Sequence, residues 1–500
     1  MDTTHVMPPA EQLYRENQQL LAEITVLRQQ LDWFKRQMFG PGKSEKTDRL
    51  QALLALEGGA AATAPEAPAQ TVSYERSSQC REERATPLEA FKHVPVAETV
   101  VIEPEEVKAQ PEAFEKIGEE RTFEIDVVPP RIFKREIVRP KYRQKADRAM
   151  PPVLAPAAAR PVPGGYASAG LLAWIIVSKY QFHLPLYRLE RMSAQWGAPI
   201  SRQSMVQWVR IAADWAEPIY KLIVARLRRG DYVQVDETPV KYLDPDEPAV
   251  GALQGYLWVM SRPGEDVVFD WRLSRRHGEA TTLITSEFCG VLQSDAYEAY
   301  AAFARAHPKV TWVGCWAHAR RGFFEAHQEN ARIVKAMLRL IGRLYQRERD
   351  WDAAGICPKQ RALERAKPEG LARTLRAIRA LAQRTRQRVL PRSLLGKACS
   401  YLLNQWEPLS AHARLGVTKL DNNLVENAIR PSCIGKKNWL FIGHPDVGQR
   451  SAIIYSLIVS CERRGIDALA YLRDILTRLP AMTNQDDLAA LLPGNWKPSS

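Results

Sequence analysis

The sequence predicts an α/β protein in which a mixed β-sheet is followed by a large helical insertion. The hydrophobic pattern changes near residue 231 from a helical period to the alternation typical of strands. Three expected strands follow one another directly, and two more alternate with helices. Residues 317–410 then have an almost wholly helical pattern. These observations predict one domain over residues 230–445 with an inserted set of helices at about 325–412.

Five short segments rich in β-branched and aromatic residues are the expected core strands: DYVQVD (231–236), QGYLWVMS (254–261), VVFDWR (267–272), GVLQSD (290–295) and VTWVGC (310–315). Helices are expected near 275–287 and 297–306. This is the chain order of a ribonuclease-H-like core. In such a sheet the first and fourth strands are neighbours, so both end at the same edge.

Three acidic residues are the candidate catalytic and metal-binding groups. Asp236 closes the first expected strand, Asp295 closes the fourth, and Glu426 lies in a later helix. A lone aspartate at a strand end usually caps a turn or helix, but two at matching ends of neighbouring strands favour a shared site. Converging carboxylates repel one another without a cation. Two Mg²⁺ or Mn²⁺ ions about 3.5 to 4 Å apart would relieve this repulsion and serve phosphoryl transfer.

Glu426 belongs to the segment DNNLVENAIRP, which predicts a short helix. Asp421 can cap its start, and Pro431 follows its expected end. Helical spacing separates apolar residues on one side from a polar arc that contains Glu426. An ordinary surface pair of Glu426 and Arg430 is the alternative. The candidate DNA contacts here are Asn423, Asn427, Arg430, Lys436 and Lys437.

The segment CWAHARR follows the last expected strand. Cys315 and His318 are three residues apart and could share a metal, but two ligands do not make a site. We therefore expect hydrogen bonding or packing near the acidic cluster, and no zinc. His318 is alternatively a contact of the scissile phosphate, and Arg320 and Arg321 are further candidate DNA contacts.

Residues 166–229 predict a helical region that could bind DNA. Helices near 169–181 and 185–195 precede a turn at Gly197 and a third helix that opens at Ser201, a favourable N-cap residue. This spacing is that of a helix-turn-helix. Packing of three helices without DNA contact is the alternative. The candidate contacts on the third helix are Arg202, Gln203, Gln207 and Arg210.

The N-terminal part predicts a dimerisation helix and a small module. Residues 1–57 contain heptads with Leu13, Leu20, Leu27 and Phe34 in one series and Asn17, Ile24, Leu31 and Met38 in the other. That pattern is typical of a parallel coiled coil, and hence of a homodimer or higher oligomer, although the helix could instead pack on its own chain. A linker (58–89), a strand-rich module (90–150, with FEIDVV and IFKREIV) and a proline-rich linker (151–165) follow.

The C-terminal part, residues 446–500, predicts a helical domain. Two helices are expected at roughly 448–464 and 466–479, joined at Gly465.

Composition favours a polyanionic partner. The 500 residues contain 70 Lys and Arg against 57 Asp and Glu, a net charge of +13. Residues 359–397 alone hold twelve basic residues against two acidic ones, which favours a DNA phosphate backbone over a solvated helix face. The 7 cysteines form no CxxC pair, so neither a disulfide framework nor a zinc ribbon is indicated. Without a signal peptide or a long apolar run, we expect a cytoplasmic, nucleoid-associated protein and no membrane partner.

Several long motifs resemble those of the DDE transposases of the insertion sequence 66 family. They are VQVDETPVKYL, LQSDAYEAY, GCWAHARRGFFEA and DNNLVENAIRPSCIGKKNWLF. The resemblance extends to MFGPGKSEK near the start and to AIIYSLIVSCERRGIDALAYLRDIL near the end, so it covers nearly the whole chain. It implies a metal-binding triad of Asp236, Asp295 and Glu426, a bacterial mobile element as the source, and accessory proteins of the same element.

The chain departs from this family at one place. Relatives usually carry a cysteine-paired zinc module before the proline-rich linker, but residues 105–147 contain no cysteine. The resemblance still implies metal-dependent cleavage at the ends of a mobile element and joining to target DNA. The alternatives are a catalytically silent DNA-binding remnant and a ribonuclease-H-like nuclease that cuts without joining.

Overall fold

The computed structural model describes residues 112, 131–142, 153–483 and 485–498. All of these except Glu112 belong to one compact unit, Glu124–Ser500. The predicted coiled coil (1–57), the first linker (58–89) and most of the strand-rich module (90–150) lie outside the described residues. Dimerisation through the N-terminal helix therefore stays a prediction.

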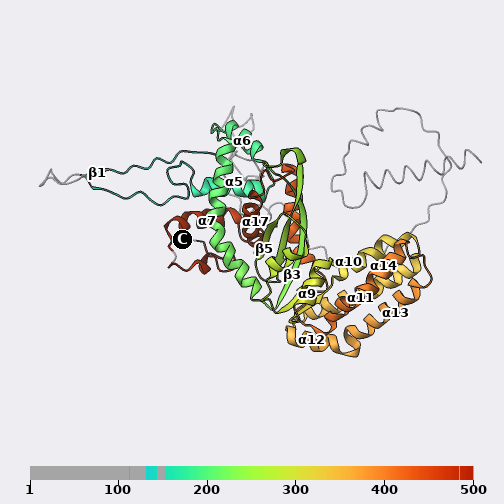
Figure 1. Ribbon diagram of the computed structural model, residues 1–500. Coiled ribbons are helices and arrows are strands. Elements are labelled where there is room, and N and C mark those ends of the chain that lie inside the picture. The colour runs from blue at the N-terminus through green and yellow to red at the C-terminus, as the bar shows by residue number, and fades with distance from the viewer. Residues whose placement is uncertain (1–111, 113–130, 143–152, 484, 499–500) are drawn as a thin grey trace, which may run out of the picture. The chain divides into compact units, whose positions relative to one another are not determined.

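The described residues form a mixed α/β structure with a helical majority, as expected (Figure 1). The strands are β1 (Lys141–Tyr142), β2 (Val153–Leu154), β3 (Tyr232–Leu243), β4 (Ala252–Ser261), β5 (Val267–Arg272), β6 (Gly290–Gln293) and β7 (Val310–Val313). The helices before and within the sheet region are α5 (Ala169–Tyr180), α6 (Leu186–Gln195), α7 (Arg202–Arg228), α8 (His277–Ile284) and α9 (Glu298–Ala306). Those after it are α10 (Trp316–Glu325), α11 (Ala331–Ala353), α12 (Pro358–Ala366), α13 (Arg373–Arg386), α14 (Leu394–Asn404), α15 (Trp406–Ser410), α16 (Asn423–Trp439), α17 (Val447–Arg463) and α18 (Ala468–Arg478).

The main sheet has five strands in the order β5-β4-β3-β6-β7. The strands β5, β4 and β3 pair antiparallel, whereas β3, β6 and β7 pair parallel. The sheet is therefore mixed, and the first and fourth core strands are neighbours, as the sequence predicts. Asp236 does not close its strand, however. The strand β3 continues to Leu243 because residues 237–243 pair with β4.

Helices cover the sheet and form one continuous hydrophobic core with it. The helix α17 packs against β5, and α7 and α5 pack against α17 (Figure 1). Ser456 and Ser460 of α17 accept hydrogen bonds from the backbone of Phe269 and Val267, which fixes the helix along β5. The predicted start of α7 is confirmed, because Ser201 accepts a hydrogen bond from the Ser204 amide. Gly465 joins α17 to α18 with a φ of 67°, a conformation that favours glycine.

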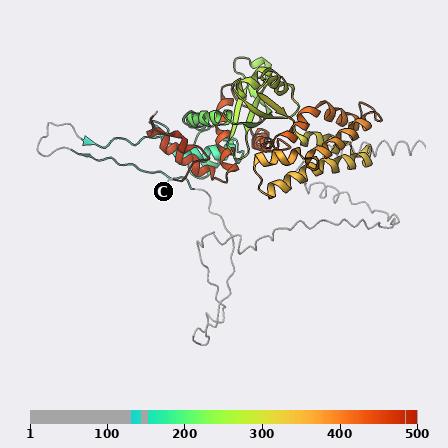
Figure 2. The same ribbon diagram turned by 90° about the horizontal axis from the view of Figure 1, so that it is seen from below.

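The helices α10, α11, α13 and α14 pack together around a second core (Figures 1 and 2). We call this set, with α12, the helical lobe. Arg365 of α12 is fully buried and donates hydrogen bonds to Glu348 of α11 and to the backbone oxygen of Thr418. Arg361 also pairs with Glu348. Two of the twelve basic residues expected to contact DNA are therefore structural.

Two further expectations are wrong. The helix that begins at Asn423 does not end before Pro431 but continues to Trp439, since its buried face continues through Ser432 and Gly435. Its N-cap position is Asn422, and Asp421 accepts a hydrogen bond from the Asn423 amide. Residues 132–138, expected as a strand, have no ladder partner. Only Ile132 among them is partly buried, so pairing there would cover little apolar surface.

Six cysteines lie in the described part of the chain, and all are free thiols. No helix in the same part combines the length and the apolar character needed to cross a membrane.

Because His412 is buried, we predict that the folded protein loses stability in mild acid. Its ring lies between the Thr418 hydroxyl and the Gly314 carbonyl, and burial lowers its pKa from 6.5 to about 4. Between these two pH values the unfolded chain binds a proton that the folded protein excludes. The free energy of unfolding should therefore fall by up to about 1.4 kcal/mol per pH unit from this group. Urea unfolding across this range should show a shallower pH dependence for His412→Gln, whereas the exposed control His327→Gln should match the wild type.

Candidate active site

Asp236 and Asp295 lie the same number of residues beyond the last pairing of the parallel strands β3 and β6, Asp236 within β3 and Asp295 after the end of β6. The last paired residues of β3 and β6 are Gln234 and Gln293, which face each other. Each aspartate lies two residues beyond its glutamine, so both emerge at the same edge of the sheet. The Glu237 amide donates to Asp236 Oδ1 at 2.8 Å, and the Tyr297 amide donates to Asp295 Oδ1 at 3.0 Å. Backbone groups thus orient both carboxylates.

Glu426 reaches this edge from the first turn of α16. Val425, Ala428 and Ile429 are buried, and the polar arc of the same helix stays partly or fully exposed, as the sequence predicts. Lys436 in the last turn donates to Thr238 Oγ1 at 3.1 Å and to the Pro239 carbonyl at 2.8 Å. This lysine therefore ties α16 to β3 and already has two acceptors, although the sequence suggested a phosphate contact.

A buried polar network sets where α16 begins relative to the two strands. The Gln234 amide nitrogen lies 2.9 Å from the Asp421 carbonyl and 3.0 Å from Gln293 Oε1. Gln293 donates to the Lys419 carbonyl at 2.9 Å, and the Lys419 amide donates to the Tyr232 hydroxyl at 3.2 Å. Both glutamines are fully buried. Hydrogen bonds from Gln234 and Gln293, the last paired residues of β3 and β6, thus hold the segment before α16 against these two strands.

These elements enclose a cavity of about 310 Å³. Its lining includes Asp236, Glu237, His318, Arg321, Glu426 and Arg430. Asp295 is not part of the lining, but its charge acts on Asp236. The structure therefore places Asp236 and Glu426 in one pocket with His318, Arg321 and Arg430, and Asp295 close enough for its charge to act on Asp236.

The electrostatics of Asp236 are unfavourable without a counter-charge. Burial, followed by the charges of Glu237 and Asp295 and finally of Glu426, raises the pKa of Asp236 from 3.8 to about 8. Glu426 Oε1 is buried and has no hydrogen-bond partner among the described residues. Carboxylate oxygens are the ligands that Mg²⁺ and Mn²⁺ prefer. The acidic residues therefore fit divalent cations of this kind, which would replace the missing positive charge.

A fourth carboxylate at the site was not predicted. The Glu237 side chain is 2 % exposed, forms an ion pair with Arg275 and accepts a hydrogen bond from Tyr300. Arg275 also stacks on Tyr297, its guanidinium carbon 3.8 Å from the ring centre. Glu237 directly follows Asp236, and alternation along a strand would have placed it on the opposite face, away from the site. The buried Tyr300 and the exposed Arg275 hold it next to Asp236.

The remaining candidate DNA contacts lie on exposed surfaces. Arg320 and Arg321 project from α10, and Asn423, Asn427 and Lys437 from α16. On α7, the opposite face is buried in the core, and Arg210 lies within 3.8 Å of Asp214. The exposed set on α7 is Arg202, Gln203, Gln207 and Arg210.

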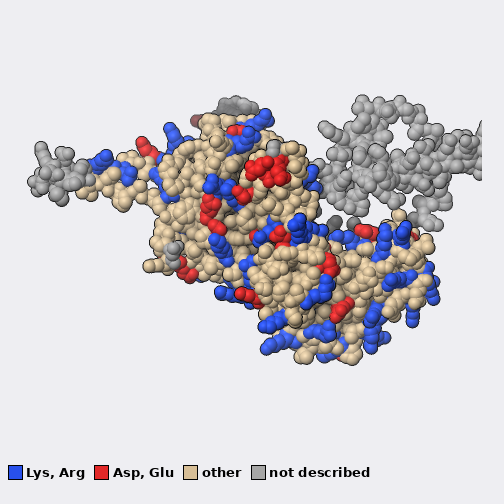
Figure 3. Space-filling view, viewed as in Figure 1, with Lys and Arg blue, Asp and Glu red and all other residues tan. Residues whose placement is uncertain are grey.

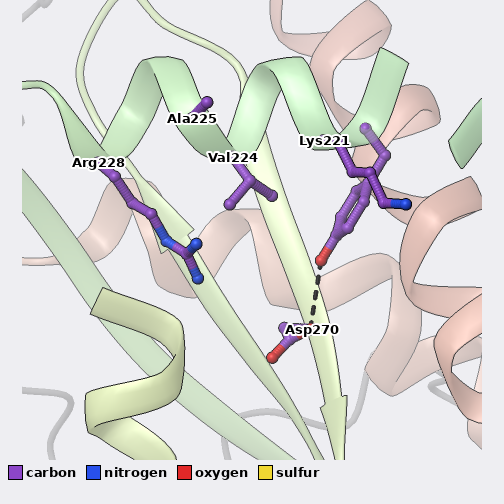
Figure 4. Close-up of a pocket in the computed structure, with 6 residues that line it drawn as sticks. Lys221, Val224, Ala225, Arg228 and Asp270 are labelled. Atoms are coloured by element: carbon purple, nitrogen blue, oxygen red, sulfur yellow. Dashed lines mark hydrogen bonds between the residues drawn. The ribbon is translucent and has the colours of Figure 1, made fainter. Parts of the chain in front are cut away.

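A second cavity of about 330 Å³ lies away from these carboxylates, between α7 and β5 (Figure 4). Asp270 accepts a hydrogen bond from Tyr220 and pairs with Arg272. Arg228 donates to the Thr282 and Leu283 carbonyls, and Lys221 pairs with Glu217. The charges around this cavity already have partners, so it offers no comparable site.

The polar network predicts a specific cost when Gln293 is replaced. Gln293→Leu leaves the Lys419 carbonyl without its donor and the Tyr232 hydroxyl without its acceptor, and a buried group that loses its partner costs about 1–3 kcal/mol. Urea unfolding should show a loss of that order. The exposed control Gln383→Leu on α13 should change stability by less than about 0.5 kcal/mol. Equal effects of the two substitutions would show that the network does not fasten α16.

Comparison with known proteins identifies the family. The pattern of the Transposase IS66 family matches residues 164–450, and that of the IS66 C-terminal element matches residues 456–493. The uncharacterized protein y4jD of Sinorhizobium fredii (strain NBRC 101917 / NGR234) is 31% identical, over 97% of this chain and 98% of that protein. The uncharacterized proteins y4qI and y4hP of the same strain are 32% and 29% identical, over 80% and 95% of this chain and 76% and 90% of their own lengths. The chain therefore belongs to the IS66 family of transposases.

Proposed function

We propose that this protein is a DDE transposase, which cuts DNA at the ends of an insertion element and joins the freed ends to target DNA. The observation that carries the proposal is the placement of Asp236, Asp295 and Glu426 around one edge of the sheet. Asp236 and Asp295 each follow the last pairing of β3 with β6 by two residues, and Glu426 lines the same cavity as Asp236. The family supports a transposase role, and the carboxylates supply the chemistry.

The sheet supports a ribonuclease-H-like core for this reaction. In the order β5-β4-β3-β6-β7, the long strand β3 lies in the middle and pairs parallel with β6. The helical lobe interrupts the chain between the second aspartate and the glutamate. The lobe has its own core, and its helix α10 carries His318 and Arg321, which line the same cavity as Asp236 and Glu426.

The residues of the site have separate roles in this proposal. Asp236, Asp295 and Glu426 would hold two Mg²⁺ or Mn²⁺ ions. When bound, the ions supply Lewis-acid activation of the attacking water and of the 3′-hydroxyl freed by cleavage. The backbone amides of Glu237 and Tyr297 hold the two aspartates in place. Arg321 and Arg430 line the same cavity and suit the scissile phosphate.

The charge distribution supports DNA as the partner. Lys and Arg side chains outnumber acidic ones on the visible face of the helical lobe (Figure 3). The exposed arginines of α13 include Arg373, Arg376, Arg384 and Arg386. Pairing of two element ends by a dimer and assistance from accessory proteins of the same element are further parts of the proposal.

Strand cleavage and joining should depend on the triad. With Mg²⁺ or Mn²⁺ and labelled DNA carrying the element's own ends, Asp236→Asn and Glu426→Gln should each lower both products by about 10²- to 10³-fold or more. The control Glu298→Gln changes an exposed acid of α9 and should retain full activity.

The same assay separates the alternative functions. Cleavage without joined product, with accessory proteins present, would point to a nuclease. Binding without cleavage, unchanged by either triad substitution, would point to a silent DNA-binding remnant.

DNA affinity should depend on salt through the helical lobe. Each exposed arginine that contacts a phosphate contributes about one unit to the slope of log affinity against log salt concentration. The double variant Arg376→Gln, Arg384→Gln should lower this slope by up to about 2 in fluorescence-anisotropy titrations. The control is Arg305→Gln, which removes an exposed arginine of α9 that already pairs with Glu298 and should leave this slope unchanged. An unchanged slope in the double variant would exclude α13 from the DNA interface.

A further inference from the structure

A cysteine, a histidine and a glutamate meet beside the two aspartates. Cys315 Sγ, a ring nitrogen of His318 and a carboxylate oxygen of Glu426 all lie within 4.8 Å of one another. Cys315 immediately precedes α10, His318 lies in the first turn of α10, and Glu426 lies in the first turn of α16. The cluster therefore joins two helix starts that are far apart in the sequence.

Backbone hydrogen bonds hold these two helix starts together. The Trp316 amide donates to the Leu420 carbonyl at 2.9 Å. The backbone amides of Asn422 and His318 hydrogen-bond to the sulfur of Cys315. The backbone therefore fixes the two helix starts that carry the three side chains.

Two atoms of the cluster lack the partners that buried polar atoms normally have. His318 Nδ1 and Glu426 Oε1 are both buried, and neither has a hydrogen-bond partner within the described part of the chain. They lie 3.7 Å apart, too far for a hydrogen bond to each other. A group placed between them would satisfy both atoms at once.

We propose that Cys315, His318 and Glu426 form a binding site for a thiophilic divalent cation, Zn²⁺ in the first instance. Sulfur, imidazole nitrogen and carboxylate oxygen are together the ligand set that Zn²⁺ takes in proteins, whereas Mg²⁺ takes oxygen ligands. The sequence alone offers only Cys315 and His318, and the fold supplies the third ligand. His318 and Glu426 also line the 310 Å³ cavity, which gives a cation a path to the site and room for a water as fourth ligand.

Binding replaces the thiol proton of Cys315 by the cation, and the proton passes to solvent. Burial raises the pKa of the Cys315 thiol to about 12, and hydrogen bonds from the Asn422 and His318 amides act in the opposite direction, toward the thiolate. Glu426 is shared with the proposed magnesium site, so a bound Zn²⁺ would engage one oxygen of the carboxylate that the two aspartates also need. The site is otherwise independent of the proposed function, because neither Cys315 nor the His318 ring belongs to the acidic triad.

Co²⁺ is a direct probe, because a thiolate ligand gives bound Co²⁺ a near-ultraviolet charge-transfer absorption. Titration of the full chain with Co²⁺ in excess Mg²⁺ and without DNA should give this absorption with one equivalent. Cys315→Ser should abolish it, and His318→Gln should weaken Co²⁺ binding by about 10-fold or more. The matched control Cys289→Ser replaces an exposed thiol and should leave the absorption unchanged.

Three results would overturn the inference. They are the absence of the absorption in the wild type, its persistence in Cys315→Ser, and its loss in Cys433→Ser, which changes the other thiol near the cavity. Asp236→Asn should keep the absorption while it loses cleavage. Failure of the cation site and failure of the transposase proposal therefore give different results.

Discussion

The buried amide network of Gln234 and Gln293 is the constraint on which the site depends. These two side chains connect the last paired rung of β3 and β6 to the backbone of Lys419 and Asp421. The aspartates lie two residues beyond that rung, and Glu426 lies one helical turn beyond Asp421. One set of buried hydrogen bonds therefore sets the spacing of carboxylates from three distant segments. These hydrogen bonds favour a single arrangement of the strands and the segment before α16, although Gln234 Oε1 has no hydrogen-bond partner within the described residues.

The helical lobe contributes to the same constraint from the other side. Arg365 is fully buried, and Glu348 and the backbone of residues 412–418 satisfy its donors. A buried charge without these partners would be strongly unfavourable, so α12 and the chain that leads to α16 hold each other in place. The lobe is thus both a basic outer surface and a support for the helix that carries Glu426. The carboxylates themselves repel one another, and rigid surroundings are what keep them close.

Much of the fold was predictable because its patterns are local. The alternation of apolar residues marks β3 to β7, and Ser201 marks the start of α7. The continuation of β3 past Asp236 was not predictable in this way, because it depends on pairing with β4. Pro431 suggested a helix end, but the buried face of α16 extends beyond it. At the site, strand patterns and helical spacing singled out Asp236, Asp295 and Glu426 as candidates. The position of Glu237 and the meeting of Cys315 with Glu426 arise from tertiary contacts that no local pattern contains.

The central claim is that Asp236, Asp295 and Glu426 act as one cation site, and Mn²⁺ binding tests it most directly. Electron paramagnetic resonance can count free Mn²⁺ during a titration of the wild type, Asp236→Asn and Glu426→Gln. We predict that Asp236→Asn and Glu426→Gln each abolish the tightest Mn²⁺ binding, although the two residues lie on different elements. Glu298→Gln should leave this binding intact. Tight Mn²⁺ binding retained in both triad variants would contradict this account of the site.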